Sequence, residues 1–185
     1  KLNIFTLLFL AKGDFLVVGN ALTDPEGVLI RRTQQGSKIR LRGGGAPDTM
    51  FTVKFCVLAE IELHCSVNQQ AFTLTPITGV SIDDNGSSGT YCSDSFFHLI
   101  MEGVSGTGIS IPHALGCIFT GSSEGNGTGI MDSTQNLRNT FINLDLEVNT
   151  VIDMELHGQG SVFQNIICVS NVTPNVDVVD AVGTQ

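Results

Sequence analysis

The sequence predicts an all-β protein, a short parallel β-helix built from coils of about 22 residues. Its composition favours short strands and frequent turns, because Val, Ile, Thr and Phe recur among Gly, Asn, Asp and Ser. Apolar residues make up 42% of the 185 positions, enough for one domain with a sizeable core. The decisive observation is an internal repeat, which fixes the expected coil length.

The repeat is a series of phenylalanines spaced by 22 residues, at Phe97, Phe119, Phe141 and Phe163. Two earlier members extend it upstream at spacings of 21 and 25 residues, namely Phe51 and Phe72. A second apolar column follows each Phe by ten to twelve residues, at Ile61, Ile82, Ile109, Ile130 and Ile152. In stacked coils, equivalent residues lie about 4.8 Å apart. We therefore expect the four later phenylalanines to be buried and to form a ladder of stacked rings.

The last two repeats show how one coil is built. FINLDLEVN (141–149) aligns with FQNIICVSN (163–171), with one Phe and two Asn preserved. In residues 144–156, apolar positions alternate with acids on both sides of Asn149-Thr150. A hairpin with both apolar faces inward would oppose like charges, which is destabilising. Two consecutive strands of one coil, turning at Asn149-Thr150, remove the conflict and leave the acids in solvent.

The first fifty residues differ from the repeat, so we expect a small N-terminal β cap or attachment region at 1–50 and the β-helix coils at 51–185. The apolar start at 1–11 is similar to a signal-peptide core, but we expect a retained buried strand or end cap. It is too short to span a membrane.

Charge is distributed unevenly. The net charge is −9, six of the nine basic residues lie between residues 31 and 54, and only Arg138 is basic after that. Such an acidic chain is a poor candidate for binding nucleic acid, which depends on Lys and Arg. The basic stretch at 29–43 is interpreted as a β-hairpin that turns at 34–37 and places Lys38, Arg40 and Arg42 on one face. That face is either a solvated edge or a docking surface for an acidic neighbouring subunit or an anionic glycan.

The sequence predicts no catalytic, metal or cofactor site. Acid pairs suited to glycoside hydrolysis occur at Asp83-Asp84, Asp145/Glu147 and Asp153/Glu155, and we interpret them as a solvated outer face. Four scattered histidines match no catalytic or metal motif, although His64 and His157 follow similar runs and suggest one equivalent coil position. Five cysteines at irregular spacings (Cys56, Cys65, Cys92, Cys117 and Cys168) are interpreted as buried free thiols.

The coil length and ladder pattern over residues 51–171 resemble the pectate-lyase-like right-handed parallel β-helices, including the trunks of phage tail spikes. The resemblance implies a virion structural protein, either spike-like, tail-fibre-like or capsid-decorating, that acts in assembly or host attachment. Such a protein would be a homo-oligomer, with a trimer favoured, found on the virion or outside the cell, and its partners would be other virion proteins or a surface glycan. The alternatives are a polysaccharide lyase or glycoside hydrolase of the β-helix type, and a bacterial surface adhesin.

Overall fold

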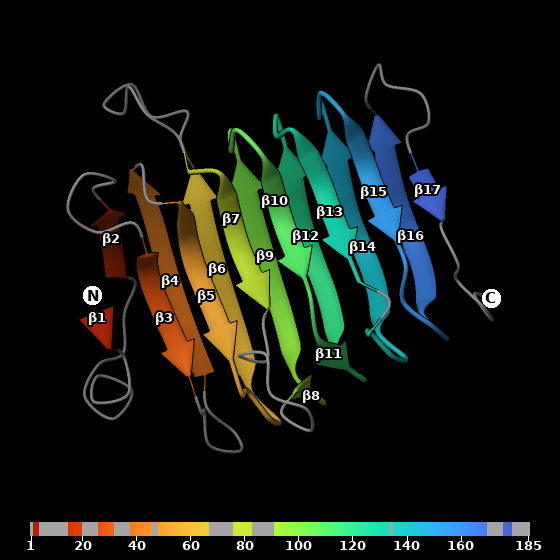
Figure 1. Ribbon diagram of the computed structural model, residues 1–185, viewed down its shortest axis with the longest axis horizontal. Helices are drawn as coiled ribbons and strands as arrows, with labels where there is room; N and C mark the ends of the chain where they lie inside the picture. Colours follow the sequence, from red (N-terminus) through yellow and green to blue (C-terminus); the bar gives the residue numbers. More distant parts are fainter. Residues whose placement is uncertain are drawn as a thin grey trace.

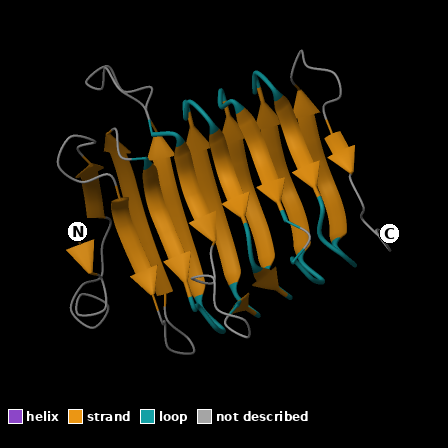
Figure 2. Ribbon diagram, in the orientation of Figure 1, coloured by secondary structure: helices purple, strands orange, loops and turns teal. Residues whose placement is uncertain are grey.

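The computed structural model describes residues 2–3, 15–19, 26–31, 38–45, 48–66, 76–82, 91–133, 135–169 and 176–178. These residues form strands and turns only, and every strand pairing among them is parallel (Figures 1 and 2). Successive coils lie side by side from the N-terminal to the C-terminal end, as the colour gradient of Figure 1 shows. The prediction of an all-β fold with parallel strands is confirmed.

Two sheets form the body. Sheet A has the order β1 (Leu2–Asn3), β3 (Glu26–Arg31), β5 (Thr49–Lys54), β7 (Thr78–Ile82), β10 (Thr107–Ile111), β13 (Thr128–Asp132), β15 (Ile152–Leu156) and β17 (Val176–Val178). Sheet B has the order β2 (Phe15–Gly19), β4 (Lys38–Gly45), β6 (Glu60–Ser66), β9 (Phe96–Glu102), β12 (Ile118–Glu124), β14 (Thr140–Glu147) and β16 (Val162–Val169). The chain alternates between the sheets, so each coil contributes one strand to each.

A third, short element closes five successive coils of the described chain on the way from sheet A back to sheet B. Here β8 (Cys92–Ser93) pairs with β11 (Ala114–Leu115), and single bridges join Val57 to Ser93, Leu115 to Leu137, and Leu137 to Gln159. We call this edge of the stack the corner. It lies at the lower end of the strands in Figure 1, where β8 and β11 are labelled.

The hairpin prediction for residues 29–43 is wrong. Strand β3 pairs with β5 in sheet A, whereas β4 pairs with β2 and β6 in sheet B. The two strands are therefore consecutive parts of one coil. The strands before residue 51 continue both sheets of the later coils, and the role of residues 1–50 as a cap or attachment region stays a prediction. Of the segment 1–11, only residues 2–3 lie within the described part of the chain.

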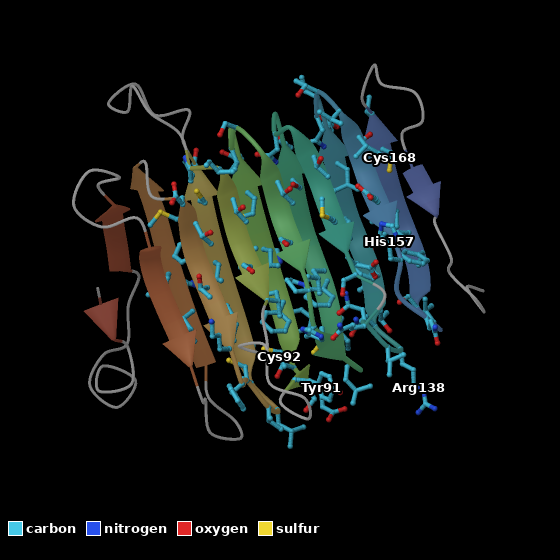
Figure 3. All side chains as sticks on the ribbon, in the orientation of Figure 1. Tyr91, Cys92, Arg138, His157 and Cys168 are labelled. Carbon is cyan, nitrogen blue, oxygen red and sulfur yellow. The ribbon has the colours of Figure 1, made fainter. Side chains whose placement is uncertain are left out.

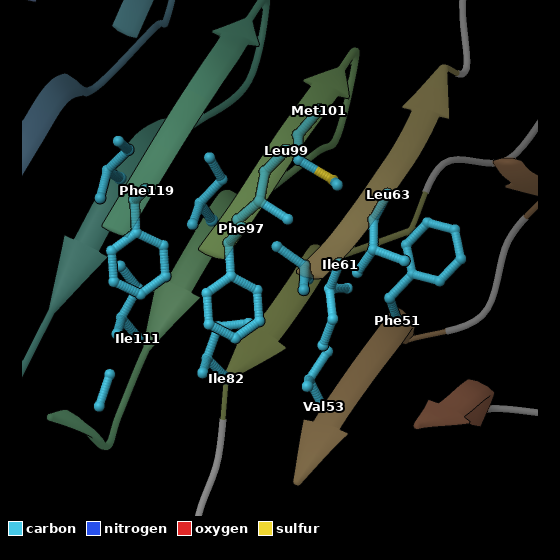
Figure 4. Close-up of a cluster of buried hydrophobic side chains, with 14 of the residues drawn as sticks. Phe51, Val53, Ile61, Leu63, Ile82, Phe97, Leu99, Met101, Ile111 and Phe119 are labelled. Carbon is cyan, nitrogen blue, oxygen red and sulfur yellow. The ribbon is translucent and has the colours of Figure 1, made fainter. Parts of the chain in front are cut away.

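The core contains the expected phenylalanine ladder. Ring centroids lie 5.1 Å apart for Phe97–Phe119, 5.3 Å for Phe119–Phe141 and 5.1 Å for Phe141–Phe163. Figure 4 shows the first two rings stacked on neighbouring strands of sheet B. Phe163 is only partly buried, because it belongs to β16, the last strand of that sheet.

The upstream extension of the ladder is wrong. Phe51 lies on β5 in sheet A and pairs with Val80, and the sheet B position before Phe97 is taken by Ile61. Phe72 lies outside the described residues. The predicted second apolar column is also partly wrong. Ile109 and Ile130 are in register, but the neighbouring positions of this column are occupied by Val80 and Met154 in place of Ile82 and Ile152. Coil lengths explain the error, because Ala59 and Ser95 occupy neighbouring coils although they are 36 residues apart.

Buried asparagines hold the turns between coils. Asn126 accepts a hydrogen bond from the Val104 N–H at 2.8 Å and donates one to the Met101 carbonyl at 2.9 Å. Asn149 repeats this one coil later, accepting from the Asn126 N–H at 3.1 Å and donating to the Ser123 carbonyl at 3.0 Å. Each side chain thus satisfies backbone groups of the preceding coil, which would otherwise be buried without partners. Asn136 and Asn139 make equivalent bonds near the corner.

Candidate interaction surface

The acid pairs lie in unlike environments. Asp145 and Glu147 lie on the outer face of β14, where they are half-buried and not fully exposed as predicted. Glu147 is in register with Glu124, which is in register with Glu102. The repulsion of Asp145, followed by burial and the charge of Glu124, raises the pKa of Glu147. Asp83 and Asp84 lie outside the described residues. The end of sheet B next to the turn into sheet A therefore carries a row of carboxylates, Glu102, Glu124 and Glu147, which we call the acid row.

The expectation that Asp153 faces solvent is wrong, because this residue is fully buried. Strand β15 buries three consecutive residues, Ile152, Asp153 and Met154, so strict alternation fails there. In the preceding coil, the position in register with Asp153 is Gly129. The carboxylate accepts a hydrogen bond from the Asn149 side-chain amide at 2.7 Å. Asp153 therefore belongs to the asparagine ladder of the turn, and only Glu155 of this pair lies on the outer face.

The histidines do not form a joint site. His64 lies on β6 in sheet B, whereas His157 follows β15 of sheet A, so the predicted equivalent position is wrong. His157 Nε2 contacts Glu155 Oε1 at 2.9 Å, and His113 lies beside the Tyr91 ring at 6.1 Å between centroids. Among the described residues, no three His, Cys, Asp or Glu side chains converge as metal ligands would.

Four of the five cysteines are fully buried free thiols, and Cys168 is half-buried at the C-terminal end (Figure 3). Burial, followed by the charge of Glu102, raises the pKa of Cys65 to about 12. Burial also raises the pKa of Cys117 to about 11. A thiol with such a pKa is almost entirely protonated at neutral pH and packs as a small apolar side chain.

The three basic residues of β4 lie in register with two acids and a histidine on the next coil. Lys38 is in register with Glu60, Arg40 with Glu62, and Arg42 with His64. Arg40 Nε donates to Glu62 Oε2 at 2.7 Å, and the Arg40 side chain remains 57% exposed. The positive charge of Arg40 is therefore balanced by a carboxylate of the same chain. A subunit contact at Lys38, Arg40 and Arg42 stays a prediction.

The outer surface at the corner is unexpectedly apolar. In five successive coils, large apolar side chains are exposed either at the corner or at the first position of the sheet B strand that follows it. We call this set the corner stripe. Its members are Val57, Leu58, Phe96, Ile118, Leu137 and Val162. Five coils are separated by four steps of about 4.8 Å, so the stripe is roughly 19 Å long. Arg138 lies next to Leu137 at this edge, where Figure 3 labels it. Exposed apolar side chains that recur over several coils are typical of interaction sites, although polar residues such as Ser93 and Thr140 lie between them.

The opposite edge of sheet B has a different character. Beside the acid row, exposed apolar side chains gather on the turn of the last coils at Val148, Val151 and Val169. The two long edges of sheet B thus carry unlike apolar surfaces. The corner stripe is flanked by Arg138 and by the exposed acids Glu60 and Asp94, and the other surface is flanked by a row of carboxylates. Neither surface could be predicted from the pattern of apolar residues, because some members alternate with core positions of their strands and the others lie in turns outside the strands.

Within the described residues, there is no helix of the length and apolarity that a membrane span needs. Comparisons of this chain with protein-family models, with curated proteins and with solved structures find no match.

Proposed function

We propose that this chain is a structural protein of a virion or another extracellular assembly, of the spike, tail-fibre or capsid-decorating kind, whose copies associate side by side. The observation that carries the proposal is the corner stripe, with its members about 40% exposed or more in each of five coils. A stack whose coils are each held by buried ladders is a rigid element, as a spike requires. The architecture supports a similarity to pectate-lyase-like β-helices of tail spikes.

The partner that fits the corner stripe is a second copy of this chain. The opposite edge of sheet B offers an apolar surface at Val148, Val151 and Val169 beside the acid row, and the corner stripe lies beside Arg138. Contact between two unlike surfaces of identical chains is heterologous, and such contacts close into rings when the rotation permits. A ring of three parallel stacks is the arrangement that we favour, with the outer faces available to other virion proteins or a surface glycan.

The test compares charged substitutions on two faces of the stack. In Phe96→Asp/Ile118→Asp, two carboxylates enter the centre of the corner stripe. The control is Met131→Asp, which changes a side chain of similar exposure, 36% against 40%, on the outer face of sheet A. Light scattering after size-exclusion chromatography should give an oligomer for the wild-type chain and the control, and a monomer for the corner variant. Equal masses for the two variants would contradict the proposal.

A second candidate is a polysaccharide lyase or glycoside hydrolase of the β-helix type. The observation in its favour is that repulsion from Asp145 raises the pKa of Glu147 on the outer face, since a general acid needs a raised pKa. Release of reducing ends from acidic polysaccharides by the wild-type chain, lost in Glu147→Gln and retained in Glu155→Gln, would establish it. A bacterial surface adhesin would share the structural role and differ in its source.

A further inference from the structure

We propose that Cys56 and Cys92 form a dithiol site that closes into a disulfide between two successive coils when a low-molecular-weight disulfide is present. This inference does not rest on the proposed assembly, but Val57 belongs to the corner stripe, so we expect the reaction in the dissociated chain, at concentrations too low for assembly. The two residues are in register at the corner, because the next residues along the chain, Val57 and Ser93, form a parallel bridge. The Ser93 N–H donates to the Cys56 carbonyl at 2.8 Å, which fixes this register.

The two thiols interact across neighbouring coils, although Cys56 Sγ also donates to the Lys54 carbonyl of its own coil at 3.7 Å. Cys92 Sγ lies 3.8 Å from the carbonyl oxygen of Val53, so this thiol is directed at the coil that contains Cys56. A hydrogen bond between the two thiols, with burial, raises the pKa of Cys92. In-register residues of neighbouring parallel strands have Cα atoms about 4.8 Å apart, within the range of about 4.4–6.8 Å that disulfides span.

The third thiol of this region is placed differently. Cys117 Sγ points at the Cys92 carbonyl oxygen at 3.3 Å, and the residue in register with Cys92 in that coil is Ala114. Cys117 instead shares a position with Asn139, whose side chain accepts a hydrogen bond from the Cys117 N–H. The geometry therefore selects one pair among the three thiols.

The pair also lies where a cross-link has most effect. The step from Cys56 to Cys92 spans 36 residues, whereas the following coils repeat after 22. A disulfide restricts the unfolded chain more when it closes a longer loop. The site is one residue from the surface, since Val57 is 41% exposed and the neighbouring Tyr91 is 36% exposed. Local opening of the corner is enough to admit a small oxidant.

The reaction is ordinary thiol–disulfide exchange. One cysteine loses its proton, attacks a sulfur of the added disulfide and releases one small thiol, which leaves a mixed disulfide on the protein. The second cysteine then loses its proton and attacks the protein sulfur of that bond, releasing the second small thiol. Two protein thiols are oxidised and one small disulfide is reduced to two thiols. Because buried thiols with raised pKa react slowly, closure should take hours at neutral pH.

The experiment incubates the full chain with glutathione disulfide and follows intact mass, peptide mapping and melting temperature. We expect a loss of two hydrogens, one cross-linked peptide joining Cys56 and Cys92, and a rise in Tm of roughly 5–15 °C that a reductant reverses. Cys117→Ala should keep the cross-link and Cys56→Ala should lose it. An unchanged mass, a cross-link through Cys117, or glutathione on Cys168 alone would overturn the proposal. The peptide map of the wild-type chain identifies the cross-linked pair even if a variant fails to fold.

Discussion

The rings of Phe119 and Phe141 stack at 5.3 Å between centroids and 20° from parallel, although the residues are 22 positions apart in the chain. Between these two residues the chain passes through sheet A and the corner, and returns to the same place one strand further along. The contact between these two rings therefore shows that one full coil of the chain is 22 residues long here. The ladder is a consequence of constant coil length in this part of the chain.

Truncating the middle of the ladder should be costly. Phe141→Ala removes a fully buried ring with a stacked neighbour on each side, so we expect a loss of about 3–5 kcal/mol in the free energy of unfolding. The matched control is Phe163→Ala, which has one stacked neighbour and is only partly buried, and should cost clearly less. Urea denaturation measures both, and equal losses would contradict a ladder centred on the middle coils.

A buried carboxylate should make stability depend on pH. Asp132 is 2% exposed, its Oδ1 accepts hydrogen bonds from the backbone N–H groups of His157 and Gly158, and its Oδ2 has no hydrogen-bond partner. Burial raises its pKa, against smaller opposing effects of those two N–H groups and of the His157 charge. Because the folded pKa exceeds the unfolded one, the stabilising contribution is complete below the unfolded pKa and is lost as pH rises through the folded pKa.

Asp132→Asn keeps the acceptor oxygen and removes the charge. We expect the variant to be more stable than the wild-type chain at pH 7 by about 1 kcal/mol, with the advantage shrinking as the pH falls through the raised folded pKa of Asp132 and levelling off below the usual pKa of aspartate. The exposed Asp48→Asn serves as control and should change stability by less than about 0.5 kcal/mol. Thermal unfolding at a series of pH values checks this, and a constant difference between wild type and Asp132→Asn would refute it.

One turn carries backbone strain that a glycine should relieve. Val148 has a φ of 56° and a side chain that is 66% exposed, whereas the preceding coils have Gly125 and Gly103 at this position, with φ of 63° and 72°. A β-branched residue is strained there, so Val148→Gly should stabilise by roughly 0.5–1 kcal/mol. Gly125→Val is the reverse change and should destabilise by about 1–2 kcal/mol. Changes of the same sign in urea denaturation would argue against this explanation.

The basic face of β4 gives a prediction about assembly. Reversing Arg40 and Arg42 to Glu breaks the ion pair with Glu62 and removes positive charge that would attract the acids of a neighbouring copy. We expect weaker association at low salt, with the difference from wild type fading as salt screens the charges. Lys54→Glu, on sheet A, is the control and should associate normally. Identical masses for the reversed and wild-type chains at every salt concentration would contradict a subunit contact at Arg40 and Arg42, and would leave these residues with contacts inside one chain only.

The regular part of the fold could be predicted because Phe97 to Phe163 repeat at a constant interval, and only a constant coil length produces that. The earlier coils could not, since 36 residues separate Ala59 from Ser95 and spacing no longer identifies partners. The burial of Asp153 could not be predicted, because β15 buries three consecutive residues, whereas an alternating pattern assigns Asp153 to solvent. Asn126 and Asn149 occur among turn residues, and nothing local shows that their side chains bond to another coil.

The central claim is that copies of this chain associate through the corner stripe, and sedimentation equilibrium of the wild-type chain tests it most directly. Measured from low to high micromolar concentration at moderate salt, the mass should be three times the 19.7 kDa of one chain. A contact held by apolar surface should persist as salt rises, because screening acts on charges and leaves hydrophobic burial in place. A species of 19.7 kDa at every concentration would contradict the account.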